Sequence, residues 1–158
     1  MKKQNWNESN IPDQSGKIFI VTGTTSGLGK ETARVLSRKN ATIIMAARNI
    51  DKAESVANEI HAENKNAKID IEELDLSSLE SISNFSQSIV KKHKTLDCLI
   101  NKAGIMACPY SKTKDGFEIQ MGTNHLGHFA LTGQLISCLL YTSPSPRDLS
   151  TSRMPSSA

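Results

Sequence analysis

The sequence predicts an α/β domain with a doubly wound parallel sheet. Continuously apolar runs such as residues 18–21 alternate with amphipathic segments along the chain, and such runs are typical of strands buried on both faces of a sheet. A glycine-containing turn joins the first apolar run to a helix-like segment. Alternation of strand and helix implies right-handed crossovers, which place successive strands parallel to one another.

The chain up to about residue 64 contains two strands and two helices. Residues 18–21 form a first strand, and residues 30–39 form a helix whose apolar side chains recur on one face. A second continuously apolar strand is expected at Thr42–Ala47. A charged amphipathic helix follows, with Asp51 as its N-cap and its end near Asn64.

The rest of the chain continues this alternation. Residues 69–74 alternate as a third strand, and Ser77 or Ser78 begins a helix with an apolar stripe. Residues 97–101 form a fourth strand. A last helix over 123–140 is apolar on nearly all sides, so it needs cover on two sides. One side would be the sheet, and the other is expected to be a subunit interface.

Size and charge exclude several classes of protein. The 158 residues allow one domain with a real core. The net charge is only +3, and the lysines are spread over the expected helices, which gives no support to nucleic-acid binding. The chain has no run of about 18 apolar residues and no apolar segment behind its first lysines, so we expect neither a membrane span nor a signal peptide.

Cysteine and histidine positions give no sign of a metal site. Cys98, Cys108 and Cys138 form no C-x-x-C pair, so neither a disulfide framework nor a zinc site is expected, and a cytoplasmic location follows from the same reasoning. His125 and His128 lie three residues apart, but no third ligand matches them. We expect them to pack or to face solvent.

The turn after the first strand predicts a cradle for a nucleotide diphosphate. Gly23 lets the strand turn sharply, Gly27 removes a side chain where backbone approaches phosphate, and Gly29 lets the helix pack closely on the sheet. The helix that begins there offers unpaired N–H groups and a positive dipole end to the pyrophosphate. The same turn includes Thr25, Ser26 and Leu28. The alternative is an ordinary strand–turn–helix connection.

The end of the second strand predicts which dinucleotide binds. A carboxylate there would accept hydrogen bonds from the ribose diol of NAD and would repel a 2′-phosphate. This chain has Ala47 followed by Arg48, whose guanidinium can fork onto phosphate oxygens. We therefore expect NADP(H) rather than NAD. The alternative is that Arg48 is an ordinary surface arginine.

The spacing Thr-Gly-x-x-x-Gly-x-Gly over residues 22–29 resembles that of the short-chain dehydrogenase/reductase family. The resemblance extends to Arg48 and to segments 74–76, 101–104 and 123–129. The sequence Asp-Gly-Phe-Glu over 115–118, before Asn-His-Leu-Gly-His-Phe, looks like the retinol-dehydrogenase-like and protochlorophyllide-reductase-like branch. The resemblance runs from about Asn10 to about Ser137. It implies a Rossmann-type sheet, incomplete here, with four strands, their helices and one further helix.

The resemblance also implies roles for residues after the third and fourth strands. Asp75 would accept a hydrogen bond from the adenine amino group, with Leu76 packed beside the ring. Alternatively, Asp75 caps the next helix. The segment with Asn101, Ala103 and Gly104 would support the central sheet and pass close to the cofactor ribose.

The chemistry that this family uses is largely missing from the chain. The family moves the substrate proton with a serine and a Tyr-x-x-x-Lys pair, and an asparagine matching Asn124 kinks a helix and holds a water beside the lysine. After Asn124 the only tyrosine is Tyr141, with Ser145 four residues later, and no lysine follows Lys114. Lys102 stands where the family usually has a second asparagine. Asn124 is thus the one catalytic residue retained, and we expect no dehydrogenase activity.

We expect three segments in the chain: a flexible one over 1–15, a partial NAD(P)-binding domain over 16–137, and a disordered tail over 138–158. Serine, threonine and proline dominate the tail without periodicity. It resembles translated library-adaptor or vector sequence, and a natural disordered tail is the alternative. A fourth strand left at the sheet edge and an uncovered apolar helix would promote association.

The sequence thus predicts the cofactor-binding half of an NADP(H)-dependent oxidoreductase. It would transfer hydride between nicotinamide and a small alcohol or carbonyl substrate, and its parent would pair with a second copy through the 123–140 helix. The alternatives are a nucleotide-binding module without chemistry and a chain without a biological role.

Overall fold

Four parallel strands form one sheet in the order β3-β2-β1-β4. The structure is a computed structural model that describes residues 6–142, with side chains for residues 6–139. The strands are β1 (Ile18–Thr22), β2 (Thr42–Ala47), β3 (Lys68–Glu73) and β4 (Cys98–Ile100). The chain winds outward from β1 to β3 and then returns to place β4 on the other side of β1. This reversal confirms the doubly wound sheet.

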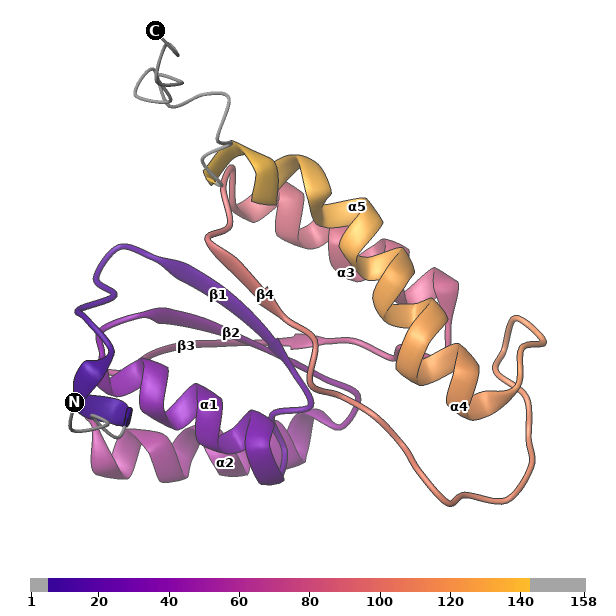
Figure 1. The fold of residues 1–158 in the computed structure, drawn as a ribbon, viewed down its shortest axis with the longest axis horizontal. Helices are drawn as coiled ribbons and strands as arrows, with labels where there is room; N and C mark the ends of the chain where they lie inside the picture. Colours follow the sequence, from indigo (N-terminus) through magenta and orange to yellow (C-terminus); the bar gives the residue numbers. More distant parts are fainter. Residues whose placement is uncertain (1–5, 143–158) are drawn as a thin grey trace, which may run out of the picture.

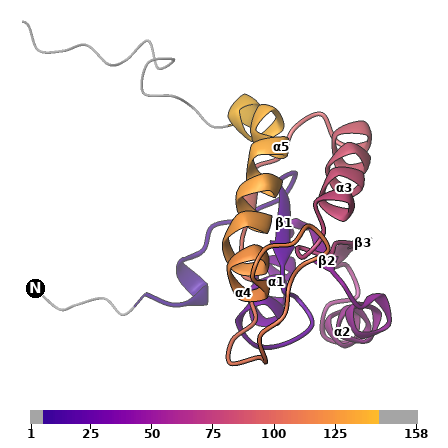
Figure 2. The same cartoon turned by 90° about the vertical axis from the view of Figure 1, so that its right-hand side faces the viewer.

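Helices cover both faces of the sheet (Figures 1 and 2). One face packs against α1 (Gly27–Arg38) and α2 (Ile50–Glu63), and the other against α3 (Leu79–Lys92) and α5 (Gly127–Thr142). Three short elements complete the described chain: η1 (Glu8–Asn10), α4 (Ile119–Met121) and the π-helical turn η2 (Gly122–Leu126).

Each face of the sheet has its own apolar core. Successive residues of a strand point to opposite faces, so Ile20 packs toward α3 and α5 whereas Val21 packs toward α1 and α2. Leu135 of α5 is fully buried in the first core, and Val56 of α2 lies in the second. The two cores together explain why the central strands are apolar without interruption.

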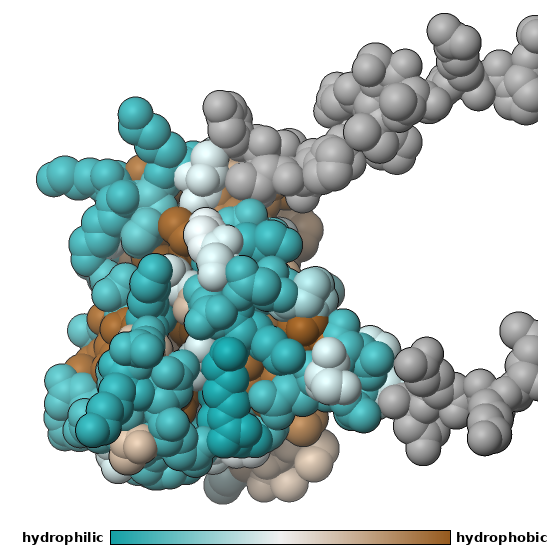
Figure 3. Space-filling model, turned by 90° about the vertical axis from the view of Figure 1, so that its left-hand side faces the viewer, coloured by the Kyte–Doolittle hydropathy of each residue, from teal (hydrophilic) through white to brown (hydrophobic). Residues whose placement is uncertain are grey.

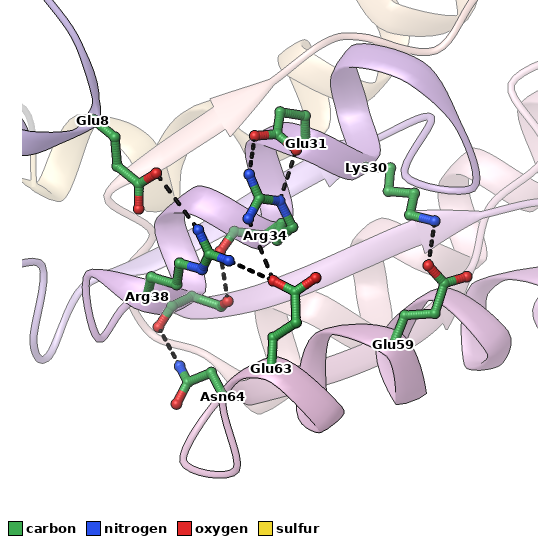
Figure 4. A network of polar contacts seen from close by, with 9 residues as sticks. Glu8, Lys30, Glu31, Arg34, Arg38, Glu59, Glu63 and Asn64 are labelled. Atoms are coloured by element: carbon green, nitrogen blue, oxygen red, sulfur yellow. Dashed lines mark hydrogen bonds and ion pairs between the residues drawn. The ribbon is translucent and has the colours of Figure 1, made fainter.

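Charged side chains connect α1 to α2 across the outer surface (Figure 4). Glu63 of α2 accepts hydrogen bonds from Arg34, at 3.3 Å, and from Arg38, at 2.5 Å. Lys30 is paired with Glu59 at 2.5 Å. The two arginines hold the pKa of the Glu63 carboxyl below its usual value. These pairs join α1 to α2 at the surface, in addition to the apolar core beneath them, and the first turn of α1 lies at the glycine-containing loop.

The first two helices begin earlier than the sequence predicts. α1 begins at Gly27 rather than residue 30, directly after Ser26. The N-cap of α2 is Asn49 and not Asp51, because the Asn49 side chain accepts the Lys52 N–H at 2.8 Å. Asp51 instead lies in the first turn, where its charge favours the helix dipole.

The later helices also differ from the sequence prediction. Of the two serines considered for the start of α3, Ser78 is the N-cap. The last helical segment begins at Ile119 rather than 123, because the Glu118 carboxylate accepts two N–H groups of its first turn. α5 continues to Thr142, past the expected domain end at residue 137. Residues 143–158 of the expected tail lie outside the described residues.

The described part of the N-terminal segment lies against α1. Gln14 donates its backbone N–H to the Lys39 carbonyl at 2.7 Å. The Asp13 carboxylate accepts a hydrogen bond from Asn40 at 2.7 Å. The domain boundary at residue 15 stays a prediction, and residues 1–5 are outside the described chain. Figure 3 shows that the side of the molecule where the strands begin is mainly hydrophilic.

β4 and α5 are the least covered elements around the sheet. β4 pairs with β1 alone among the described strands, and its residues are only half-buried. On α5, Phe129 is 74% exposed and Ile136 is 44% exposed. No helix within residues 6–142 is long and apolar enough to cross a bilayer.

Candidate cofactor-binding site

A cleft of about 580 Å³ opens where the strands end, beside the reversal between β1 and β4. This is the place where doubly wound sheets bind their ligands. Most of the residues expected to bind a cofactor line it: Gly23, Thr25, Ser26, Leu28, Gly29, Arg48, Asp75, Leu76, Ala103 and Gly104. Gly27 and Asn101, also expected there, are not among its lining residues.

The turn from β1 to α1 is built so that backbone segments approach closely. Gly23 has φ +71°, and a Cβ there would lie 2.7 Å from the Cα of Ala103. A Cβ on Gly29 would collide with the carbonyl group of Gly23. Gly27 differs, because open space surrounds it and its φ of +56° is what favours glycine.

The first turn of α1 offers hydrogen-bond donors to the cleft. The first N–H groups of a helix have no partner within the helix, and the Ser26 side chain caps none of them in the described structure. Ser26 and Leu28 both line the cleft. Free N–H groups and the positive end of the helix dipole together form a site for an anion such as phosphate.

The opposite wall of the cleft carries positive charge. Arg48 follows β2 directly and is exposed, and Lys52 lies in the first turn of α2. Lys102 lines the cleft from the β4 side. The only carboxylate among the lining residues is that of Asp75. The balance therefore favours an anionic ligand.

Asp75 is held as a carboxylate at the end of β3. Its Oδ1 accepts the backbone N–H of Ser77 at 3.0 Å and the Ser77 hydroxyl at 2.6 Å. Burial raises the pKa of the Asp75 carboxyl, but these hydrogen bonds and the positive charges of Lys114 and Arg48 outweigh burial and lower the pKa. Because Ser78 is the N-cap of α3, Asp75 organises the preceding turn instead of capping the helix itself.

The loop after β4 is attached to the end of β1. The Thr22 hydroxyl oxygen accepts the N–H of Lys102 at 2.8 Å and that of Ala103 at 2.9 Å. These bonds bring Ala103 against Gly23, at the bottom of the cleft. Asn101 points elsewhere, since its amide donates to the Thr132 hydroxyl on α5 at 3.2 Å. The structure therefore places Asn101 between β4 and α5 and not in the cleft.

Asn124 connects the same loop to the π-helical turn η2. Its Oδ1 accepts the N–H of Ile105 at 2.8 Å, and its Nδ2 donates to the Ile105 carbonyl at 2.7 Å. Asn124 itself does not line the cleft, whereas Ile105 and Thr123 do. The turn coincides with the helix kink that the family resemblance implies. A water beside Asn124 stays a prediction.

Several lining residues were not expected from the sequence: Thr22, Ala46, Ala47, Asn49, Leu74, Lys52, Lys102, Ile105 and Thr123. Lys52 had a signal, because it lies in the first turn of the helix that follows Arg48, close to the carboxyl end of β2. Ile105 and Thr123 had none, since they reach the cleft only through the Asn124 contact. The side of the cleft that Ile105 and Thr123 form therefore depends on contacts between segments distant in sequence.

The two histidines do not form a pair. His125 is exposed, whereas His128 is buried and contacts Thr22 and Asn124. Within the described residues, no three His, Cys, Asp or Glu side chains are grouped so that they could hold a metal ion.

Comparison with known proteins agrees with this fold. The short chain dehydrogenase family model matches residues 17–145. The chain belongs to the short-chain dehydrogenase family, and its curated relatives confirm the resemblance to the retinol-dehydrogenase-like branch. Mouse retinol dehydrogenase 12 is 48% identical over 129 residues, which cover 82% of this chain and 41% of the relative. Human retinol dehydrogenase 11 is 46% identical over 130 residues, with the same shares covered.

Solved structures show the same architecture. A protein of uncharacterised function from Mycobacterium paratuberculosis has a TM-score of 0.75 and 43% identity, covering 85% of this chain and 47% of that one. A short chain dehydrogenase from Shigella flexneri, solved in complex with NADP, has a TM-score of 0.68 and 30% identity, covering 81% and 55%. The chain therefore spans about two fifths of the length of the curated relatives described above.

Proposed function

We propose that this chain is the cofactor-binding half of an NADP(H)-dependent oxidoreductase that transfers hydride between nicotinamide and an alcohol or carbonyl substrate. One observation carries the proposal: the glycine turn, the first turn of α1 and Arg48 line the same cleft. The first turn of α1 supplies N–H donors for a pyrophosphate, and Arg48 supplies positive charge for the 2′-phosphate. The NADP complex of the Shigella relative supports the choice of cofactor.

The residues of the cleft fit this cofactor on physical grounds. Gly23 and Gly29 let the turn and the first turn of α1 pack closely, so the free N–H groups of that helix would be held where phosphate oxygens can accept from them. Arg48 and Lys52 would hold the 2′-phosphate, since no carboxylate follows β2 to bind a ribose diol. Asp75 and Leu76 would border the adenine. When bound, the nicotinamide would accept or donate the hydride.

The proton that accompanies the hydride needs groups that this chain lacks. A carbonyl oxygen must gain a proton as its carbon gains hydride, and no tyrosine after Asn124 has a lysine four residues later. Tyr110 and Lys114 have that spacing, but Tyr110 is exposed and neither residue lines the cleft. We therefore expect purified chain with NADP(H) to oxidise no alcohol and reduce no carbonyl compound. Detectable turnover would contradict this. The missing pair also supports the alternative of a nucleotide-binding module without chemistry.

Association of the parent protein through α5 is part of the proposal. The α5 side chains that point away from the sheet include Phe129 and Ile136, both of them exposed. An apolar helix face of this kind favours contact with a second apolar surface. We propose a second copy as the partner and a cytoplasmic location for the protein.

The cofactor assignment is tested by measuring the affinity of the chain for NADPH and NADH by calorimetry. Arg48→Ala should weaken NADPH about tenfold, because it removes charged hydrogen bonds to phosphate, and should leave NADH within about twofold. Arg48→Asp should reverse the preference. Arg38→Ala is a matched control at the far end of α1. An NADPH preference that survives both Arg48 substitutions would show that Arg48 does not read the 2′-phosphate.

A further inference from the structure

His128 lies buried where α5 crosses the ends of the strands, and the function proposed above gives it no role. Only 8% of the surface of His128 is exposed to solvent. Its Nδ1 lies 2.9 Å from the carbonyl oxygen of Asn124, and its Nε2 lies 3.1 Å from the hydroxyl oxygen of Thr22. Both ring nitrogens therefore have a polar partner, and the two partners come from different elements.

The contacts determine which nitrogen carries the proton. A carbonyl oxygen can only accept a hydrogen bond, so Nδ1 must be the donor to Asn124. The Thr22 oxygen already accepts N–H bonds from Lys102 and Ala103, which occupy its two lone pairs. The hydroxyl must therefore donate, and Nε2 accepts from it. The carbonyl of Ile100 is a poorer acceptor for that hydroxyl, at 3.4 Å.

This arrangement requires a neutral imidazole with its hydrogen on Nδ1. A charged imidazolium would present a second N–H to the Thr22 oxygen, which has no free lone pair. The other neutral tautomer would place Nε2–H against the same oxygen and leave Nδ1 facing the Asn124 carbonyl without a hydrogen. Either state would leave buried polar atoms unsatisfied, which is costly.

We propose that His128 is a positioning residue that couples the two walls of the cleft. On one side, Thr22 precedes the Gly23 turn and holds the backbone of Lys102 and Ala103. On the other side, the Oδ1 and Nδ2 atoms of Asn124 form hydrogen bonds with the backbone N–H and carbonyl of Ile105. The imidazole joins Thr22 to the Asn124 backbone.

The coupling matters because the wall that contains Ile105 is not part of the sheet. The loop from Ile105 to α4 has no regular structure until the short bridge between Lys112 and Glu118. At Ile105 this loop is attached through the Asn124 side chain, and that side chain extends from a turn with π-helical bonding. By holding the carbonyl of that turn, His128 sets where Ile105 lies relative to Gly23.

The tautomer is tested by ¹⁵N nuclear magnetic resonance of the histidine rings in the full chain at neutral pH. The inference expects the His128 ring to be neutral, with hydrogen on Nδ1. Exposed His125 serves as the internal comparison, with the tautomer mixture of a solvated ring. A charged His128, or hydrogen on its Nε2, would overturn the inference, and this readout needs no cofactor.

The coupling is tested by substitutions at His128 with matched ones at His125. In H128F the Ile105 amide should exchange with solvent about tenfold faster, and NADPH should bind about tenfold more weakly, because two hydrogen bonds are lost. H128Q, which keeps an acceptor near the ε position, and H128N, which keeps a donor near the δ position, should each lose about threefold. H125Q should change neither quantity.

The outcomes separate this inference from the proposed function. If the unsubstituted chain does not bind NADPH, the proposed function is wrong, and Ile105 exchange and the tautomer still decide the role of His128. If H128Q and H128N lower only the melting temperature, with Ile105 exchange and NADPH affinity unchanged, His128 is a packing residue and the coupling is wrong. The milder substitutions keep the test available should H128F not fold.

Discussion

The two faces of the sheet are held together by different forces. On the α1/α2 face, charged side chains pair across the helices in addition to an apolar core, with Glu63 contacting Arg34 and Arg38. On the α3/α5 face, α5 carries no Asp, Glu, Lys or Arg between Gly127 and Thr142. Its packing on α3 and the sheet is mainly apolar, with hydrogen bonds joining His128 to Thr22 and Thr132 to Asn101. It leaves Phe129 and Ile136 exposed.

This difference indicates which face supports cofactor binding and which face is available for association with another subunit. The α1/α2 face is closed on its outer side by ion pairs, and it positions the first turn of α1 at the cleft. On the α3/α5 face, α5 exposes the apolar side chains Phe129 and Ile136, and the sheet ends at the half-buried strand β4. We interpret the α1/α2 face as the support of the nucleotide site, and the α3/α5 face as the surface where we propose contact with a second copy.

The largest expected effect is on the apolar face. Leu135→Ala should lower the free energy of unfolding by about 3 kcal/mol, because it leaves a cavity among fully buried side chains. Ile136→Ala, one residue further along α5 and 44% exposed, should cost less than about 1 kcal/mol. Urea unfolding of both variants measures the difference. Equal losses would mean that α5 does not pack as described.

The same substitution at two glycines should have opposite signs on the two faces. Gly29→Ala should destabilise the chain by about 2 kcal/mol, because its Cβ would meet the Gly23 carbonyl. Gly133→Ala lies in open space within α5 and should stabilise it by about 0.5–1 kcal/mol through helix propensity. Chemical unfolding of both variants measures the two changes in the free energy of unfolding. A harmless Gly29→Ala would contradict the close approach of turn and helix.

Salt should distinguish the two faces in a smaller way. Glu63→Gln removes the charge that both arginines contact, so it should lower the urea midpoint slightly at low ionic strength. The difference from the unsubstituted chain should shrink toward zero in about 1 M salt, where the Debye length is about 3 Å. Leu135→Ala should show no such salt dependence. A Glu63 effect that salt leaves unchanged would indicate packing rather than charge.

The smallest effect concerns pH at the cleft. The pKa of the Asp75 carboxyl is lower in the folded chain than in the unfolded one. The stability that this ionised group contributes is thus present above the unfolded value, about pH 4, and is lost as pH falls through the folded value. The stability difference between the unsubstituted chain and Asp75→Asn should therefore shrink below about pH 4. A difference independent of pH would argue against the Ser77 and Lys114 contacts.

The sheet and most of the cleft could be predicted from the sequence because their signals are local. Buried parallel strands are apolar throughout, and a glycine turn between strand and helix requires those glycines wherever it occurs. Helix starts were harder, since Asn49 and Asp51 are both good caps and only the geometry of the turn decides between them. The predicted start of α1 also missed its first turn.

The remaining parts of the site depend on contacts distant in sequence. Asn101 was expected in the cleft with its neighbours, but its amide bonds to Thr132 on α5. Asn124 meets Ile105, and His128 meets Thr22, 106 residues away. No periodicity or spacing encodes such pairs, because they arise only when α5 packs across the end of the sheet.

The most direct test of the cofactor site is a crystal structure of the chain with NADP bound. We expect the pyrophosphate at the first turn of α1, beside Gly23 and Gly29, and the 2′-phosphate within hydrogen-bond distance of Arg48. NADP bound at any other place, or with its phosphates away from that turn, would contradict the account.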